Sequence, residues 1–225
     1  MKYGILFLMM GGLLAYYGFF LGGWGWLLVW PALSVCIVAA GYLGLGARVF
    51  GKRTDGTIAW FTLVVLFPYF LYAWTIWHLS RLLRREDCFN EICPGLYVGR
   101  RAFAGELPKD VRAVADLTAE FAEPREVRDG RRYLCLPTLD ASVPSETELR
   151  EFVQAILRES GPTYVHCAEG HGRSGMVAAA LLVSKGLATD VEDAVAQLRK
   201  VRPGIRLNER QAALVARVSS TPAVL

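Results

Sequence analysis

The chain has 225 residues, of which 25 are basic and 21 acidic, so its net charge is only +4. Hydrophobic residues make up 53% and the mean hydropathy is +0.31. Both values are higher than an ordinary soluble enzyme would show, and we expect no nucleic-acid partner. No charged residue occurs from Tyr3 to Ala47 or from Ile58 to Trp77. The sequence therefore predicts a membrane region over residues 1–80, followed by a charged domain.

Two membrane-spanning helices are predicted at the start of the chain. Residues 3–21 are just long enough to cross about 30 Å of hydrocarbon, and residues 24–46 are comfortably long enough. Gly22 and Gly23 would form a tight hairpin between them. Because a second apolar span follows directly and no clear cleavage site is present, we favour a membrane anchor over a cleaved signal peptide.

The third apolar stretch, residues 57–78, has two interpretations. Pro68 at its centre would kink a helix. Basic residues flank the stretch on both sides, and the positive-inside rule places both flanks in the cytoplasm. We favour two full spans followed by a re-entrant or interfacial segment; three spans, with the loop around Lys52 outside, is the alternative. We therefore expect a multi-pass protein of a bacterial inner membrane whose charged domain faces the cytoplasm.

A basic juxtamembrane linker is expected over residues 81–91. Arg81, Arg84 and Arg85 lie next to the apolar region, where they are either only a stop-transfer flank or also attract anionic headgroups, by about 1 kcal/mol each. Membrane lipids are thus expected partners. The five cysteines show neither the spacing of zinc ligands nor a disulfide framework, so we expect no metal.

Residues 92–220 are predicted to form a compact α/β domain with a small central sheet flanked by helices. Ser145 and Glu148 have the spacing of a capping box in front of an amphipathic helix, and Asp190 can cap a later helix. Residues 205–218 contain the last helix. Short strands are expected at residues 96–98, 111–117, 133–136 and 164–166.

One loop carries the most specific chemistry in the chain. Strand residues lead into Cys167, and Arg173 and Ser174 begin an apolar helix. Backbone N–H groups in a loop with glycines above a helix N-terminus bind anions, and their field favours a thiolate. Arg173 would hold two phosphate oxygens in a fixed fork. The pattern predicts a phosphate attacked by sulfur. The expected phosphate-binding loop is Ala168, Glu169, Gly170, His171, Gly172 and Arg173.

The run His-Cys-x5-Arg-Ser resembles the signature of the dual-specificity phosphatases, within the cysteine-based protein-tyrosine-phosphatase superfamily. The resemblance extends from about residue 92 to 214 and includes Gly-Leu-Tyr-Val-Gly at 95–99. It implies a general acid after the strand that precedes the cysteine strand, where Asp140 lies, with Asp116 as the rival. It also implies that Ser174 hydrogen-bonds to the Cys167 sulfur and eases its departure. The membrane region lies outside the resemblance.

This resemblance implies a phosphomonoester phosphatase that works through a phosphocysteine intermediate and needs no cofactor. The favoured substrate is a phospholipid headgroup, with phosphatidylglycerophosphate first, because an anchored site works at the membrane surface and similar mitochondrial-type members use this lipid. One alternative is a protein tyrosine or dual-specificity phosphatase acting on membrane-proximal phosphoproteins. An inactive phosphate-binding module is the second alternative, disfavoured by the intact Cys167, Arg173 and Asp140.

Two further side chains have open roles. His171 would pair with a second anionic group of the substrate or with Glu169, or would only shape the loop. Cys135 lies on the strand leading to the Asp140 loop, where it is either a redox partner of Cys167 or a buried structural thiol.

Overall fold

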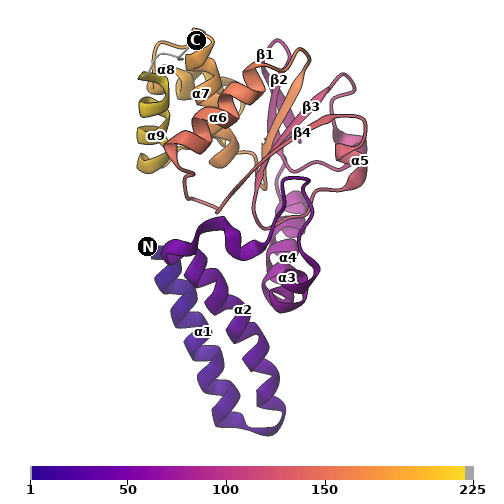
Figure 1. Ribbon diagram of the computed structural model, residues 1–225, viewed down its shortest axis with the longest axis vertical. Helices are drawn as coiled ribbons and strands as arrows, with labels where there is room; N and C mark the ends of the chain where they lie inside the picture. Colours follow the sequence, from indigo (N-terminus) through magenta and orange to yellow (C-terminus); the bar gives the residue numbers. More distant parts are fainter. Residues whose placement is uncertain (1, 221–225) are drawn as a thin grey trace. The chain divides into compact units, whose positions relative to one another are not determined.

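The computed structural model describes residues 2–220 and divides into two compact units (Figure 1). Unit 1 contains the chain up to residue 53, residues 57–85 and residues 119–122. Unit 2 contains residues 54–56, residues 86–118 and the chain from residue 123 onward. The chain thus passes between the two units several times.

Unit 1 is built from helices. Two helical stretches, Lys2–Leu21 and Gly23–Phe50, are long and apolar enough to cross a membrane. Gly22 and Gly23, with φ of +55° and +44°, turn the chain between them as predicted. The elements are α1 (Lys2–Leu21), the 3₁₀ turn η1 (Gly23–Leu28), α2 (Val29–Ala40), the π-helical turn η2 (Gly41–Leu45), the 3₁₀ turn η3 (Gly46–Phe50), α3 (Trp60–Val65) and α4 (Phe67–Leu83).

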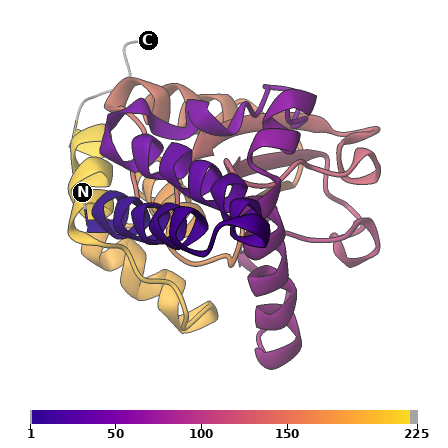
Figure 2. The same cartoon turned by 90° about the horizontal axis from the view of Figure 1, so that it is seen from below.

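Glycines at every seventh position bring α1 close to the second helical stretch (Figures 1 and 2). Gly4, Gly11 and Gly18 are buried residues of α1. A Cβ on Gly11 would lie 2.5 Å from Cys36 Sγ, and one on Gly18 would lie 3.1 Å from the Gly25 carbonyl oxygen. Seven residues are nearly two helical turns, so these glycines share one face and let the two backbones approach. The other faces of α1 expose large apolar side chains, as in helices that face lipid.

The third apolar stretch forms two helices separated by a single residue. α3 ends at Val65, and Leu66 has φ −95° and ψ 10° before α4 begins. Pro68 lies in the first turn of α4, where a missing N–H costs no hydrogen bond, so the predicted irregularity falls two residues before the proline. Side chains of α2 satisfy groups at the break: Trp30 Nε1 donates to the Val65 carbonyl at 3.2 Å, and Ser34 Oγ accepts the Tyr69 N–H at 3.3 Å.

Unit 2 is an α/β domain on a five-stranded sheet of order β1-β2-β5-β3-β4, which confirms the predicted fold class (Figure 1). β1 and β2 are antiparallel, and all other neighbours are parallel. The sequence reasoning missed β1, although Pro94-Gly95 between two strand-like segments is a hairpin signal. The strands are β1 (Phe89–Cys93), β2 (Leu96–Arg100), β3 (Ala113–Thr118), β4 (Arg132–Thr138) and β5 (Thr163–Cys167).

Helices cover one face of this sheet, and one short helix lies against the other (Figure 1). The predicted caps are confirmed, because Ser145 Oγ accepts the Glu148 N–H at 3.2 Å and Asp190 Oδ1 accepts the Asp193 N–H at 2.9 Å. The first face carries α6 (Glu146–Leu157), α7 (Arg173–Ser184), α8 (Val191–Val201) and α9 (Glu209–Ser220), and the second carries α5 (Arg125–Arg128). The 3₁₀ turn η4 (Ala104–Glu106) lies between β2 and β3 in the chain. All five residues of the central strand β5 are buried.

The glycine face of α1 provides a test of the helical packing. Gly11→Val should destabilise the protein by about 1–3 kcal/mol, because the new side chain overlaps Cys36 and the Ala32 carbonyl. Gly12→Val is the matched control, since a Cβ there has no neighbour within 4 Å. Thermal unfolding of the full chain in detergent, followed by tryptophan fluorescence, should show a melting temperature several degrees lower for Gly11→Val only. Equal effects of both variants would contradict this packing.

Candidate active site

The nucleophile expected from the sequence, Cys167, lies at the C-terminal end of β5, the usual position of ligand sites in parallel sheets. Its side chain is buried, and two groups contact the sulfur. The Gly170 N–H donates to Cys167 Sγ at 3.3 Å, and Ser174 Oγ lies 3.4 Å from Sγ. Both contacts suit a negatively charged sulfur, because each can supply a hydrogen bond to it.

Glycine is required at two positions where the phosphate-binding loop meets the sheet. Gly170 has φ of +78°, and a Cβ there would lie 2.4 Å from the Gly99 carbonyl carbon and 2.6 Å from the Arg100 nitrogen. A Cβ on Gly99 would in turn lie 2.2 Å from the Cys88 carbonyl oxygen. The loop therefore rests directly on the backbone of β2, which fixes its height above the sheet.

Arg173 and Asp140 lie together beside the loop. Arg173, at the first position of α7, is buried, and its Nη1 donates to the Thr138 carbonyl at 2.9 Å. Arg173 Nη2 lies 3.3 Å from Asp140 Oδ1, and the Asp140 side chain is 75% exposed. The structure thus brings Asp140, from the loop after β4, next to the phosphate-binding loop, where the resemblance placed a general acid.

The Asp140 loop is held by residues that sequence reasoning did not select. Asn208 Nδ2 donates to the Ala141 carbonyl at 3.0 Å, and Gln211 Nε2 donates to the Ser142 carbonyl at 3.3 Å. The two side chains also bond to each other's backbone N–H groups at the start of α9. Local sequence patterns do not reveal Asn208 and Gln211, because their partners are 67 and 69 residues away in the sequence.

The other residues of the phosphate-binding loop contact the segment after β2, the start of α7 and the linker. The Ala168 carbonyl accepts the Arg101 N–H at 3.2 Å, and Gly172 precedes the first turn of α7. His171 Nε2 lies 2.6 Å from Glu86 Oε2, so the imidazole pairs with a carboxylate from the juxtamembrane linker. That partner was not foreseen, because 85 residues separate the two positions.

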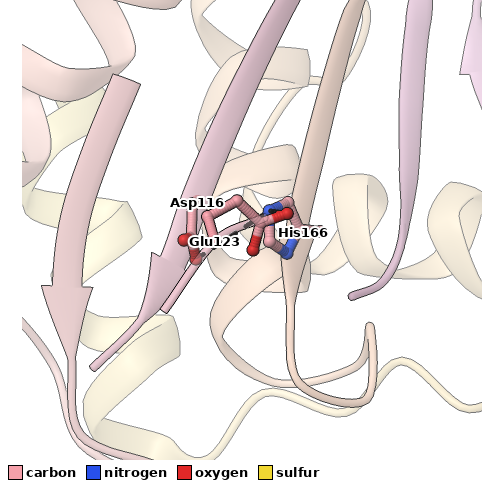
Figure 3. Close-up of side chains that lie close together, drawn as sticks. All are labelled: Asp116, Glu123 and His166. Atoms are coloured by element: carbon pink, nitrogen blue, oxygen red, sulfur yellow. Dashed lines mark ion pairs between the residues drawn. The ribbon is translucent and has the colours of Figure 1, made fainter. Parts of the chain in front are cut away.

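Asp116, Glu123 and His166 form a buried cluster (Figure 3). His166 directly precedes Cys167 in the sequence. His166 Nε2 is 3.9 Å from Asp116 Oδ1 and 3.8 Å from Glu123 Oε1. Two carboxylates and an imidazole are a donor set that divalent metals accept. However, Glu123 Oε2 already pairs with Arg101 Nε at 3.3 Å, which favours a structural role.

Asp116 is likewise engaged by its own neighbours. Its Oδ1 accepts bonds from the Thr118 N–H at 2.7 Å and from Thr118 Oγ1 at 2.8 Å, and its Oδ2 accepts the Tyr133 hydroxyl at 2.7 Å. Burial, and then the Asp116 carboxylate, raise the pKa of Tyr133 above its ordinary value, so this hydroxyl stays protonated and donates. We conclude that Asp116 fixes local structure and is not placed as a general acid.

Cys135 is too distant from Cys167 for a disulfide. It pairs with Asp116 of β3, and Asp116 pairs with His166 of β5, so a whole strand separates the two cysteines. Two strand spacings amount to about 9–10 Å, whereas bridged cysteines need Cα atoms within about 7 Å. Of the two expected roles, the half-buried structural thiol is the one that this register allows.

Comparisons with known proteins agree with this geometry. Residues 102–187 match a family described as "Polymorphic toxin system, DSP-PTPase phosphatase". The human dual specificity protein phosphatase CDC14A is 28% identical over 146 residues, which cover 55% of this chain and 24% of that protein. The solved structure of Tk-PTP in its active form is 27% identical, with a TM-score of 0.54, and the match covers 60% of this chain and 98% of Tk-PTP.

The matched part of the chain, residues 102–187, is thus a domain of the cysteine-based protein-tyrosine-phosphatase superfamily. It is a phosphatase domain of the protein-tyrosine and dual-specificity type. The crystal structure of PTPMT1 in complex with PI(5)P, 24% identical with a TM-score of 0.54 over 59% of this chain and 95% of PTPMT1, has the same fold. The chain spans about a quarter of the length of the curated relatives it matches.

The close approach of Gly170 to β2 makes a specific prediction for the phosphatase domain. Gly170→Ala should lower hydrolysis of p-nitrophenyl phosphate by about a hundredfold or more, because the methyl group cannot fit against Gly99 and the loop must move. Gly130→Ala is the control, since Gly130 has a similar φ of +75° with open space around it. Activity and melting temperature of both full-length variants separate the two effects. Similar activity losses in both variants would show that the effect comes from the positive φ and not from the contact between Gly170 and Gly99.

Proposed function

We propose that this chain is a membrane-anchored, cysteine-dependent phosphomonoester phosphatase that acts on a phospholipid headgroup, with phosphatidylglycerophosphate as the first candidate. The arrangement that carries the proposal is the loop in which Gly170 and Ser174 contact the Cys167 sulfur while Arg173 reaches Asp140. A thiol, an arginine and a carboxylic acid so arranged are the groups that phosphoryl transfer to sulfur requires.

The proposed reaction has two steps. In the first, the Cys167 thiolate forms a bond to phosphorus while the bond to the leaving oxygen breaks, and Asp140 gives that oxygen a proton. Arg173 and the loop N–H groups stabilise the charge on the three equatorial oxygens. In the second, water attacks the phosphocysteine and loses a proton to Asp140, and the sulfur–phosphorus bond breaks. The Ser174 hydroxyl, 3.4 Å from Sγ, stabilises the departing thiolate.

The short linker supports a lipid substrate. α4 ends at Leu83 and β1 begins at Phe89, and the residues between them span at most roughly 20 Å when fully extended. Unit 1 carries two stretches long and apolar enough to anchor the chain in a bilayer. A domain tethered so closely meets lipid phosphates at high effective concentration. PTPMT1, which shares the fold, was solved in complex with PI(5)P.

The turn before α3 supports a topology with two crossings. Residues 54–56 belong to unit 2, where the Gly56 carbonyl accepts the Glu123 N–H at 2.9 Å and Arg128 donates to the Asp55 carbonyl. The chain therefore leaves unit 2 at residue 56 and returns to it at residue 86. A segment that begins and ends beside one domain has not crossed the membrane, so we infer that α3 and α4 are re-entrant or interfacial. The basic residues on both flanks support a cytoplasmic location for that side.

The substrate class is tested with the full-length enzyme in mixed micelles. Phosphate release should be at least tenfold more efficient, as kcat/KM, from phosphatidylglycerophosphate, phosphatidic acid or PI(5)P than from a phosphotyrosyl peptide. Cys167→Ser is the control that should abolish turnover, because a serine hydroxyl, unlike a thiol, is not ionised at neutral pH and is a weak nucleophile without an activating base. Faster turnover of the peptide than of every lipid would favour the protein phosphatase, and no turnover of any substrate would favour an inactive module.

The topology is tested with reporter fusions in a bacterial host. A fusion after Gly51 should give a fluorescent cytoplasmic protein and inactive alkaline phosphatase, because that turn is expected on the cytoplasmic side. A fusion after Gly23, in the predicted external hairpin, should show the opposite pattern and serves as the control. Active alkaline phosphatase at Gly51 would require three full crossings.

A further inference from the structure

A single buried guanidinium contacts the phosphate-binding loop and the juxtamembrane linker at once. Arg202 follows α8 directly and is 0% exposed. On one side, its Nε donates to the Gly170 carbonyl at 2.9 Å and its Nη2 to the Glu169 carbonyl at 3.3 Å. On the other side, its Nη1 donates to the Asp87 carbonyl at 3.0 Å and to Asn90 Oδ1 at 2.8 Å. Only an arginine offers this many donors in one rigid plane.

Both backbone polar groups of Gly170, its N–H and its carbonyl, are therefore hydrogen-bonded. Its N–H points to Cys167 Sγ at 3.3 Å, and its carbonyl points to Arg202 Nε at 2.9 Å. A loop that binds anions must direct N–H groups inward, which leaves its carbonyls facing outward. Arg202 stabilises those outward carbonyls, so it supports the orientation that the sulfur and a bound phosphate need.

Glu86 completes this arrangement from the linker. Its Oε2 lies 3.2 Å from Arg202 Nη2 and 2.6 Å from His171 Nε2, so one carboxylate oxygen contacts both the guanidinium and the loop. Gly204 leaves the room for this contact, because a Cβ there would lie 2.3 Å from His171 Nε2 and 2.6 Å from Glu86 Oε1. The carboxylate therefore balances the buried positive charge behind the loop.

We propose that linker residues 86–90 help to form the catalytic site, and that Arg202 and Glu86 are positioning residues for the phosphate-binding loop. The inference deepens the proposed function and rests on it. The last helix of the apolar region ends at Leu83, three residues before Glu86. The segment that connects the domain to its anchor thus also supports the loop that carries the chemistry.

Two explanations of Glu86 predict effects of opposite sign. If the carboxylate acted only through its charge, its removal would favour a thiolate and a bound anion, and the rate would rise. If it holds Arg202 and His171 in place, its removal loosens the loop, and the rate falls. The sign of the change in Glu86→Gln therefore separates positioning from simple electrostatics.

The experiment compares four full-length variants with the unaltered protein. Arg202→Lys keeps the positive charge but loses the planar guanidinium group with its several N–H donors. It should lower kcat/KM for p-nitrophenyl phosphate by about tenfold or more. Glu86→Gln should lower it by about threefold. The controls are Arg199→Lys, which removes a bond to the Ile205 carbonyl, and Glu91→Gln, which weakens a bond from the Gly95 N–H. Both controls should stay within about twofold.

A second measurement does not depend on turnover. The rate at which iodoacetamide alkylates Cys167 at neutral pH, and its protection by orthovanadate, report the thiolate and the anion site directly. Arg202→Lys and Glu86→Gln should both slow alkylation and weaken protection. If they do so in a protein that hydrolyses nothing, the proposed function fails while the positioning role stands.

The positioning role is overturned by any of three results. These are an unchanged or faster rate in Glu86→Gln, equal losses in Arg202→Lys and Arg199→Lys, or a lower melting temperature in Arg202→Lys with normal kcat/KM and normal alkylation. If Arg202→Lys does not fold, Asn90→Ala removes one acceptor of the same guanidinium and should slow alkylation in the same direction; a normal rate there would contradict the role.

Discussion

The direct backbone contact between Gly170 and Gly99 is the constraint on which the active site depends. No side chain separates the phosphate-binding loop from β2, so the loop height, and with it the position of the Cys167 sulfur, is set by the sheet itself. This contact requires β2 to lie beside β5, which the order β1-β2-β5-β3-β4 provides. A rigid sheet can hold reacting groups more accurately than a loop supported only by other loops.

Three arginines near the loop each have a carboxylate partner, and the exposure of that partner differs. Glu123, beside Arg101, is fully buried, Glu86, beside Arg202, is 28% exposed, and Asp140, beside Arg173, is 75% exposed. Breaking the buried pair would leave an uncompensated charge in the interior, whereas the exposed pair is held weakly and can rearrange. The gradient matches the proposed roles: the most exposed carboxylate is the one that must exchange protons with a substrate.

Local patterns in the sequence predicted much of the fold. The capping residues Ser145 and Asp190, the turn at Gly22 and Gly23, and four of the five strands follow from spacing and residue type alone. β1 was missed because its half-buried residues alternate weakly, so only the Pro94-Gly95 turn marked it.

The residues of the candidate site were harder to predict from the sequence than the fold. Cys167, Arg173 and Ser174 lie within one motif, and Asp140 came from the family resemblance. Glu86, Arg202, Asn208 and Gln211 are joined to the loops by tertiary contacts across 32 to 85 residues, and no periodicity in the sequence reports such contacts.

The sheet order also has a consequence for how the protein is made. β5 is the last strand to be synthesised, yet it lies in the centre and joins the β1–β2 hairpin to the β3–β4 pair. Before β5 is available, these are two separate two-stranded ribbons, which are marginally stable in water. The strand that unites the sheet is the one that ends in Cys167. Folding of the sheet and assembly of the loop after Cys167 are therefore coupled, and a chain not yet synthesised through β5 has no phosphate-binding loop with which to act prematurely.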